Sequence, residues 1–259
     1  RLSLMKKSST ALAVSLLLTI VSLSCRNTSA CREASVGEPD SLSLLFTGDV
    51  LFDRGVRRTI EHRGAEWLFR EVSPLFRQAD AVVVNLECPL TEVHAPVHKQ
   101  FVFRADPALA AVMRKAGVTH AAMANNHTND QGRRGLVDTY DCLTDAGIQP
   151  LGYGSTMDEQ LTPCIVEKGS QRVALFNAVM FSLENWHYLE GRPGISQSTA
   201  EELAEAVRAH KAAFPRDRVV CILHWGTEFQ SHPSMQQRRQ ASILAAAASF
   251  DAATPTGFH

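Results

Sequence analysis

The sequence contains no apolar run long enough to cross a membrane and no motif of the common esterases and peptidases. Its longest apolar stretch, residues 11–23, is shorter than the roughly 18 residues that indicate a transmembrane helix. The patterns GxSxG and HExxH are both absent, so neither a serine esterase nor a zinc peptidase is supported. These absences exclude a multi-span membrane protein, whereas a glycosidase stays open.

An excess of charge of either sign is also missing. The chain has 26 Lys and Arg against 27 Asp and Glu, and no long run of one sign occurs. This balance argues against nucleic acid as a partner. Hydrophobic residues make up 45% of the chain and charged residues 20%, which predicts a globular protein with a substantial core.

The six cysteines form no CxxC pair and have no zinc-type spacing with histidine. Four of them, Cys88, Cys142, Cys164 and Cys221, lie in or beside apolar stretches. Disulfides would be compatible with an exported chain, but the spacing specifies no pairs. The positions favour small buried hydrophobic side chains.

The N-terminal residues have the pattern of an export signal. Met5 is followed by Lys6, Lys7 and the short apolar run at 11–23, as in a secretory signal peptide. A small residue then precedes Cys25, which indicates a lipoprotein processing site. Cleavage there would leave a lipidated Cys25 on the extracytoplasmic side of a membrane. The alternatives are an ordinary signal peptide cut nearby and an uncleaved anchor.

The chain therefore divides into a signal peptide at 1–24, a tether at 25–41 rich in Ser, Glu, Gly and Pro, and a domain at 42–259. Within the domain, short apolar runs predict strands at 42–46, 81–86, 119–124 and 218–223, and a hairpin at 164–167 with 172–179. Helical patterns occupy 107–116, 135–146, 199–214 and 235–249. Strands that alternate with helices predict a layered α/β domain with largely parallel strands.

Four of these strands end in side chains that can bind a metal. The residues are Asp49, Glu87, Asn126 with His127, and His224. Ligands bind at the carboxyl ends of strands in open α/β folds. Carboxylate, amide and imidazole groups together suit Mn, Fe or Zn, and two close ions could polarise a phosphoryl oxygen and generate hydroxide. Each residue alone also permits a structural role, such as a turn or helix cap for Asp49 or a core histidine for His224.

Five segments carry a family resemblance. They are FTGDVLFDRG (46–55), ADAVVVNLECPLTE (79–92), KQFVFRADP (99–107), residues 116–148 around ANNHTND, and CILHWGTEFQSHPSMQQRRQA (221–241). Their order and spacing resemble the CapA-type capsule synthesis proteins, the PGA_cap family of the calcineurin-like metallophosphoesterase superfamily. The resemblance implies a four-layer α/β/β/α sandwich and an exported, membrane-associated protein of poly-γ-glutamate capsule production.

The resemblance also implies roles for individual residues. Metal ligation falls to Asp49, Glu87, Asn126 and His224. His127 corresponds to the histidine that protonates the leaving-group oxygen as a general acid. Leu51 stands where the wider superfamily has a second ligand histidine, so that ligand is missing.

Three further residues are candidates for substrate binding. Lys99 and Arg104 could bind an anionic substrate, and their alternative is a pair of exposed loop charges. Glu228, in HWGTE, is characteristic of the family, and we assign it to the same group. The implied partners are polyglutamate, capsule synthase subunits and the membrane lipid of the anchor.

The C-terminal residues depart from the family pattern. After the helix at 235–249 the sequence reads FDAATPTGFH, without the histidine-bearing motif that the family places there. We therefore expect a truncated domain that lacks the last metal ligands and its C-terminal strands. Two functions remain in view: a metal-dependent hydrolase of capsule biosynthesis, and a non-catalytic membrane component that binds polyglutamate or a synthase partner.

Overall fold

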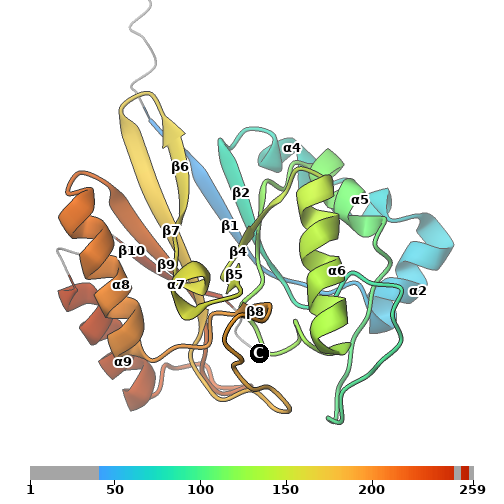
Figure 1. Ribbon diagram of the computed structural model, residues 1–259. Coiled ribbons are helices and arrows are strands. Elements are labelled where there is room, and N and C mark those ends of the chain that lie inside the picture. The colour runs from blue at the N-terminus through green and yellow to red at the C-terminus, as the bar shows by residue number, and fades with distance from the viewer. Residues whose placement is uncertain (1–40, 248–251, 257–259) are drawn as a thin grey trace, which may run out of the picture. The chain divides into compact units, whose positions relative to one another are not determined.

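The computed structural model describes residues 41–247 and 252–256 (Figure 1). The chain divides into two compact units, residues 1–41 and 42–259, and the described helices and strands belong to the second. The predicted signal peptide, Cys25 and the tether up to residue 40 lie outside the described residues, so they stay predictions. Within the described part of the chain, no helix is both long and apolar enough to cross a membrane.

The first sheet has four parallel strands in chain order. They are β1 (Leu44–Val50), β2 (Ala81–Leu86), β3 (His120–Ala122) and β4 (Gln149–Leu151). Helices return the chain between the strands: α2 (Arg54–Arg63), α3 (Glu66–Phe69), α4 (Ser73–Phe76), α5 (Leu109–Ala116) and α6 (Gly132–Asp145). All six residues of β2 are buried, because a central parallel strand is covered on both faces.

The second sheet has the order β10-β9-β7-β6. Its strands are β6 (Cys164–Lys168), β7 (Gln171–Val179), β9 (Arg218–His224) and β10 (Ala252–Thr256). The β6–β7 hairpin is antiparallel, whereas β7, β9 and β10 are parallel. Helices α8 (Ala200–Ala213) and α9 (Met235–Ala246) accompany this sheet, and the short elements β5 (Tyr153–Gly154), α7 (Met157–Gln160) and β8 (Gly194–Ile195) complete the described elements.

Three apolar clusters define the layers. One packs the first sheet against its helices, with Val84 and Leu136 among its members, and a second packs the other sheet against α8 and α9. The third lies between the sheets, where Val83 of β2 and Ile222 of β9 are both buried. Figure 1 shows the resulting order of helices, sheet, sheet and helices. The predicted four-layer α/β/β/α sandwich is therefore confirmed.

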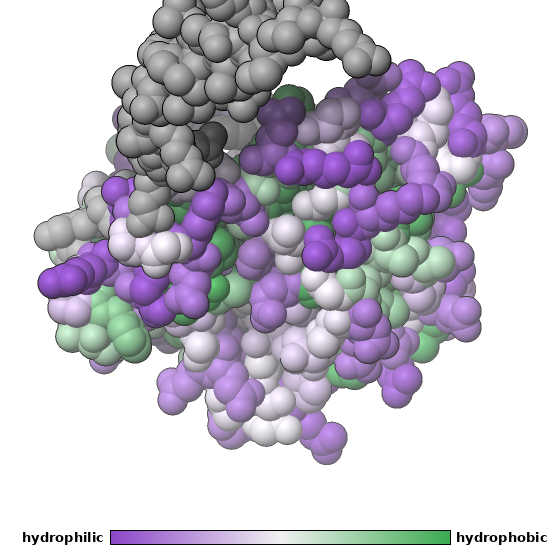
Figure 2. Space-filling model, turned by 90° about the horizontal axis from the view of Figure 1, so that it is seen from above, coloured by the Kyte–Doolittle hydropathy of each residue, from purple (hydrophilic) through white to green (hydrophobic). Residues whose placement is uncertain are grey.

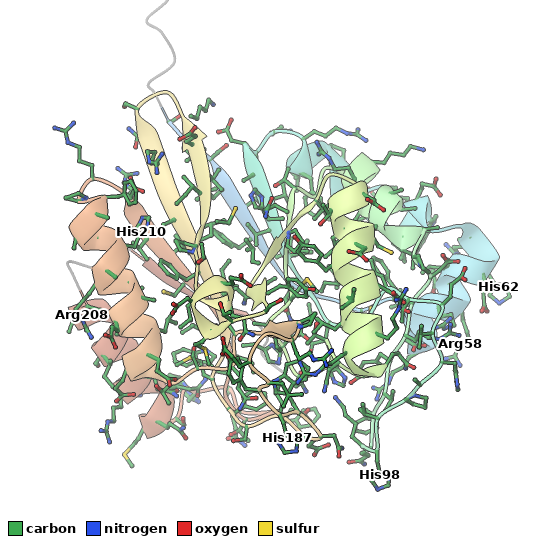
Figure 3. All side chains as sticks on the ribbon, viewed as in Figure 1. Arg58, His62, His98, His187, Arg208 and His210 are labelled. Carbon is green, nitrogen blue, oxygen red and sulfur yellow. The ribbon has the colours of Figure 1, made fainter. Side chains whose placement is uncertain are left out.

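The ends of the sandwich differ in what they carry. Figure 2 is seen from above, toward the end at which β1 begins, and hydrophilic residues cover much of the visible face there. The carboxyl ends of the parallel strands lie at the opposite end, near the loops that carry His98 and His187 (Figure 3). The strand-end residues singled out in the sequence therefore belong to the end away from the view of Figure 2.

The sequence-based elements are confirmed with small shifts of their ends. The Thr199-x-x-Glu202 pattern is a complete capping box at the start of α8. The strands β4, β5, β8 and β10, of two to five residues each, were not predicted. Cys88 and Cys221 are buried free thiols, as expected, and burial raises the pKa of each to about 12, whereas Cys142 and Cys164 are half-buried.

Candidate metal centre

A bulge in β1 determines toward which face of the sheet the Asp49 side chain points. Phe46 pairs with Val83 and Asp49 pairs with Asn85, so three steps along β1 match two steps along β2. One extra residue reverses the alternation of the side chains beyond it. Phe46 packs between the sheets, and the bulge brings Asp49 to that same face, where its Oδ1 accepts a 2.7 Å hydrogen bond from Asn85 Nδ2. Without the bulge, Asp49 would face the helices.

The alternation of side chains along β2 and β9 brings three more side chains to the same place. Val83 lies between the sheets, and Asn85 and Glu87 follow it at spacings of two residues. In β9, Ile222 lies between the sheets and His224 follows two residues later. Residues at this spacing share a face of a strand. The two sheets therefore contribute side chains to one site at their carboxyl ends.

The predicted metal ligands converge at this end. Asp49, Glu87 and His224 each offer a ligand atom, and these atoms all lie within 4.8 Å of one another. His224 Nε2 is 3.8 Å from Glu87 Oε1 and 2.9 Å from Asn126 Oδ1. Glu87 and His224 are buried, whereas Asp49 is exposed. Two carboxylates, an imidazole and an amide oxygen form a donor set that fits Mn, Fe or Zn.

The helix-cap alternative for Asp49 is wrong, because Asp53 caps α2. The Asp53 carboxylate accepts from the backbone N–H of Arg54 at 2.7 Å and pairs with Arg57 at 3.0 Å. Burial alone would raise the pKa of Asp53, but the bonds from Arg57 and from the backbone N–H groups of Arg104 and Arg54 outweigh it and lower the pKa. Asp49 therefore takes no part in capping α2, and its side chain stays at the end of β1.

Two buried asparagines that the sequence analysis did not single out hold the carboxylates in place. The side-chain amide of Asn85 donates to both Asp49 and Glu87, and its carbonyl accepts from Asn125 Nδ2 at 3.1 Å. Asn125 also donates to the Leu86 carbonyl at 2.8 Å. The available signal was a polar residue inside the apolar run AVVVNL, because a buried amide needs partners.

His127 belongs to a buried charge cluster beside the predicted ligands. Its Nδ1 lies 2.8 Å from Asp130 Oδ2, and Lys99 Nζ lies 2.7 Å from Asp130 Oδ1. The Lys99 ammonium also donates to the Asn126 carbonyl at 2.6 Å and lies 3.3 Å from His127 Nδ1. The Phe103 ring packs on the imidazole with 4.3 Å between centroids. Asp130, which the sequence analysis also left out, thus connects the loop of Lys99 to the turn after β3.

The three predicted substrate-binding residues lie in different settings. The side chain of Lys99 is only 7% exposed and its ammonium pairs with Asp130, so Lys99 is not an exposed loop charge. Arg104 donates to the backbone carbonyls of residues 91–92, which anchors that loop. Glu228 is exposed and lines two cavities beside the ligand cluster.

These two cavities border the ligand cluster and adjoin each other. One, of about 370 Å³, is lined by His127 and Lys99, and the other, of about 420 Å³, is lined by Trp225 and His232. Asn126, Phe181 and Glu228 line both. Since Asn126 also contacts His224, the point where the two cavities meet lies beside the ligand cluster. Asp49, Glu87 and His224 themselves line neither cavity.

The family follows from the sequence match. The model of the family described as "Bacterial capsule synthesis protein PGA_cap" matches residues 43–254. The chain belongs to this family. The family resemblance predicted from the five sequence segments is therefore confirmed.

Curated relatives carry matching names. The PGA biosynthesis protein CapA of Bacillus subtilis (strain 168) is 27% identical over 217 residues, which cover 79% of this chain and 54% of the relative. The capsule biosynthesis protein CapA of Bacillus anthracis is 25% identical over 227 residues, covering 85% and 55%. A probable polyglutamine synthesis accessory protein of Mycobacterium tuberculosis is 26% identical over 238 residues, covering 74% and 62%. The chain thus spans about half the length of the two Bacillus relatives.

Among solved structures, a calcineurin-like phosphoesterase from Bacillus subtilis aligns with a TM-score of 0.48 and 16% identity. The alignment covers 83% of this chain and 71% of that one. The layered fold itself rests on this chain's own sheets and clusters.

Proposed function

We propose that this chain is an exported, membrane-anchored protein of poly-γ-glutamate capsule biosynthesis whose metal centre hydrolyses a phosphoester. The observation that carries the proposal is the convergence of Asp49, Glu87 and His224 within 4.8 Å, beside the His127–Asp130 pair. Family membership and the names of the curated relatives support the capsule role.

The metal would be held by Asp49, Glu87, Asn126 and His224. A bound divalent ion supplies positive charge that polarises a phosphoryl oxygen and lowers the pKa of water. Asn85 donates to both carboxylates, so these ligands are oriented by the protein itself. Such pre-oriented ligands reduce the reorganisation that binding would otherwise require.

His127 is the proposed general acid. A carboxylate only accepts hydrogen bonds, so Asp130 Oδ2 at 2.8 Å favours a hydrogen on His127 Nδ1 and leaves Nε2 for proton transfer. In hydrolysis the oxygen of water bonds to phosphorus and the bond to the leaving oxygen breaks. The imidazolium form of His127 gives its Nε2 proton to that leaving oxygen, and the proton lost by the attacking water restores this form. Lys99 offsets the charge of Asp130 and fixes the turn that carries the imidazole.

The location at the membrane is proposed from the N-terminal signal and Cys25. Labelling of cells with an alkyne fatty acid should mark the chain, and Cys25→Ala should abolish the label and release the protein from the membrane fraction. Retention of the label in the variant would reject Cys25 as the lipidation site.

The alternative function is a non-catalytic component that binds polyglutamate or a synthase partner. Two substrates separate the possibilities in the Mn²⁺-loaded full chain. Diglyceryl phosphate has an alkoxide leaving group that needs a proton, whereas bis(4-nitrophenyl) phosphate has a leaving group that needs little help. We expect His127→Gln to lower kcat for diglyceryl phosphate by about 100-fold or more and to affect the nitrophenyl substrate less.

Controls separate metal binding from proton transfer. Asp49→Ala should weaken Mn²⁺ binding in calorimetric titration, whereas His127→Gln should leave it unchanged. His62→Gln, on the exposed surface of α2 (Figure 3), should leave both metal binding and hydrolysis unchanged. A wild-type chain that binds Mn²⁺ but cleaves neither diester, together with normal capsule in cells that carry His127→Gln, would favour the non-catalytic role.

A further inference from the structure

The two cavities beside the ligand cluster form a trough, defined as the surface lined by Phe101, His127, Phe181, Glu184, Trp225 and Glu228. The cavities adjoin at Asn126, Phe181 and Glu228. Because Asn126 also contacts His224, the candidate ligand cluster lies beside the point where the two cavities meet. This arrangement accommodates a substituent on each side of a phosphate, as in a phosphodiester.

The charges in the trough are unfavourable for a polyanion. Glu184 and Glu228 are exposed, and within the described part of the chain neither makes an ion pair. Of the lysine and arginine side chains that the structure describes, Lys99 is the one that lines these cavities, and its ammonium pairs with buried Asp130. Uncompensated charges of one sign exclude ligands of the same sign. Polyglutamate, with a carboxylate on every residue, would meet this repulsion.

A second cation lies near the trough without lining it. The guanidinium of Arg54 stacks on the rings of Phe101 and Phe103, at 4.6 and 4.8 Å from their centroids. Arg54 is not among the residues that line either cavity. It supports the aromatic wall, and within the described part of the chain it makes no ion pair with Glu184 or Glu228.

The aromatic residues suit sugar rings. Phe101 is 47% exposed and Phe181 is 37% exposed, and Trp225 lines the second cavity. Aromatic faces bind the apolar faces of rings, while exposed carboxylates accept charge-assisted hydrogen bonds from hydroxyl groups. Glu184 and Glu228 thus oppose an anionic chain and favour a hydroxyl-rich one.

We propose that the trough binds a phosphodiester whose two substituents are uncharged sugars or polyols, and that polyglutamate is not the ligand of this site. The inference rests on the proposed function, because it names the substrate class of the same centre. It assigns Glu184 and Glu228 as specificity residues that act by repulsion of anionic chains and by acceptance of hydroxyl hydrogen bonds.

Binding measurements test this class without any need for turnover. The probes are cellohexaose, an uncharged sugar chain, and γ-linked hexaglutamate, an anionic chain of equal unit number, each titrated calorimetrically into the Mn²⁺-loaded full chain at low salt. We expect cellohexaose to bind more tightly than hexaglutamate. Phe101→Ala should weaken cellohexaose binding about 5-fold, whereas Phe214→Ala, at a residue that is 48% exposed on another part of the surface, should not.

Charge removal gives the sharper result. The double variant Glu184→Gln/Glu228→Gln should strengthen hexaglutamate binding about 5-fold or more at low salt, and salt should narrow the difference from wild type. The matched double variant Glu61→Gln/Glu205→Gln, on the exposed surfaces of α2 and α8, should change nothing. Tighter binding of hexaglutamate than of cellohexaose by wild type, or no binding of cellohexaose, would overturn the inference.

Failure of this inference can be distinguished from failure of the proposed function. Loss of Mn²⁺ binding or of diester hydrolysis counts against the hydrolase, whereas the calorimetric preference between the two probes counts for or against the substrate class. A chain that hydrolyses diglyceryl phosphate yet prefers hexaglutamate would retain the proposed function and lose this inference.

Discussion

Two buried aspartates in the sandwich each pair with a histidine, at opposite ends of the strands. Asp130 follows β3, and its Oδ2 lies 2.8 Å from His127 Nδ1. Asp217 directly precedes β9, and its Oδ2 lies 3.0 Å from His210 Nε2. Each carboxylate also has a basic partner, a lysine for Asp130 and an arginine for Asp217. The two clusters therefore share a carboxylate, an imidazole and a cation, which is an ammonium in the first and a guanidinium in the second.

The surroundings of the two histidines differ: one lines a cavity and the other packs against aromatic rings. His127 lines a cavity beside the ligand cluster. The ring of His210 lies 6.0 Å from Phe176 and 5.1 Å from Phe214, centroid to centroid, and Figure 3 shows it on α8 away from His98 and His187. A histidine–aspartate pair is thus a candidate for chemistry only where the strand ends leave space for a ligand.

The largest effect should come from substitution at the first pair. Asp130→Asn keeps the size of the side chain but removes the charge that orients His127, so we expect kcat for diglyceryl phosphate to fall about 100-fold. Asp217→Asn should leave kcat within about 3-fold of wild type, provided that assays are run well below the unfolding temperature. Circular dichroism verifies that both variants are folded. Equal losses of kcat would contradict the distinction between the two pairs.

The layers and the convergence of the candidate ligands could be predicted from the sequence, because apolar runs predict the strands and the candidate ligands follow them. Asp49, Glu87, Asn126 and His224 stood directly at or after predicted strands, and parallel strands bring such residues to one edge. The face of the sheet toward which the Asp49 side chain points could not be predicted in this way. It depends on the bulge between Phe46 and Asp49, which adds a residue without any change in the local pattern of residue types.

The supporting residues were harder to predict because their partners are distant in sequence. Asn85 acts with Asn125, and Lys99 acts with Asp130, across separations that a local pattern does not reveal. The sequence suggested two alternatives for Lys99, an anion-binding residue and an exposed loop charge. Neither describes an ammonium that is 7% exposed and paired with Asp130. Burial of a lysine requires knowledge of the loop's position over the turn after β3.

A half-buried histidine, His120, sharpens the comparison, because it has no carboxylate partner among the described residues. His120 in β3 contacts the Thr119 hydroxyl at 2.7 Å, and burial lowers its pKa to about 4. Above its unfolded pKa of about 6.5 both states are neutral, and as the pH falls toward 4 only the unfolded state gains the proton. We expect a loss of about 2 kcal/mol in unfolding free energy over this window.

Urea unfolding at a series of pH values measures this loss. His120→Gln should flatten the profile between pH 6.5 and 4, whereas His62→Gln, on the surface of α2, should retain the wild-type slope. A slope that persists in the His120→Gln variant would assign the acid sensitivity to another group.

The smallest expected effect concerns the Asp217 cluster. Burial alone would raise the pKa of Asp217, but hydrogen bonds from Arg172 and His210 outweigh it and lower the pKa below 3.8. Its stabilisation is therefore present above pH 3.8 and is lost as the pH falls through the lower folded pKa. Because Arg172 is 37% exposed, solvent screening limits the cost of Asp217→Asn to about 1 to 2 kcal/mol at neutral pH.

Thermal or urea unfolding at pH 7 and pH 3 measures that cost. The difference in unfolding free energy between wild type and Asp217→Asn should be largest at pH 7. It should narrow at pH 3, below 3.8, where the carboxyl of the unfolded state gains a proton. The Glu167 side chain is 64% exposed and is the more exposed partner of Arg172. Glu167→Gln should therefore lower the unfolding free energy by less than about 0.5 kcal/mol. A gap that stays constant down to pH 3 would mean that the Asp217 charge does not stabilise this end of the sandwich. The contrast with Asp130 would then rest on its effect on hydrolysis alone.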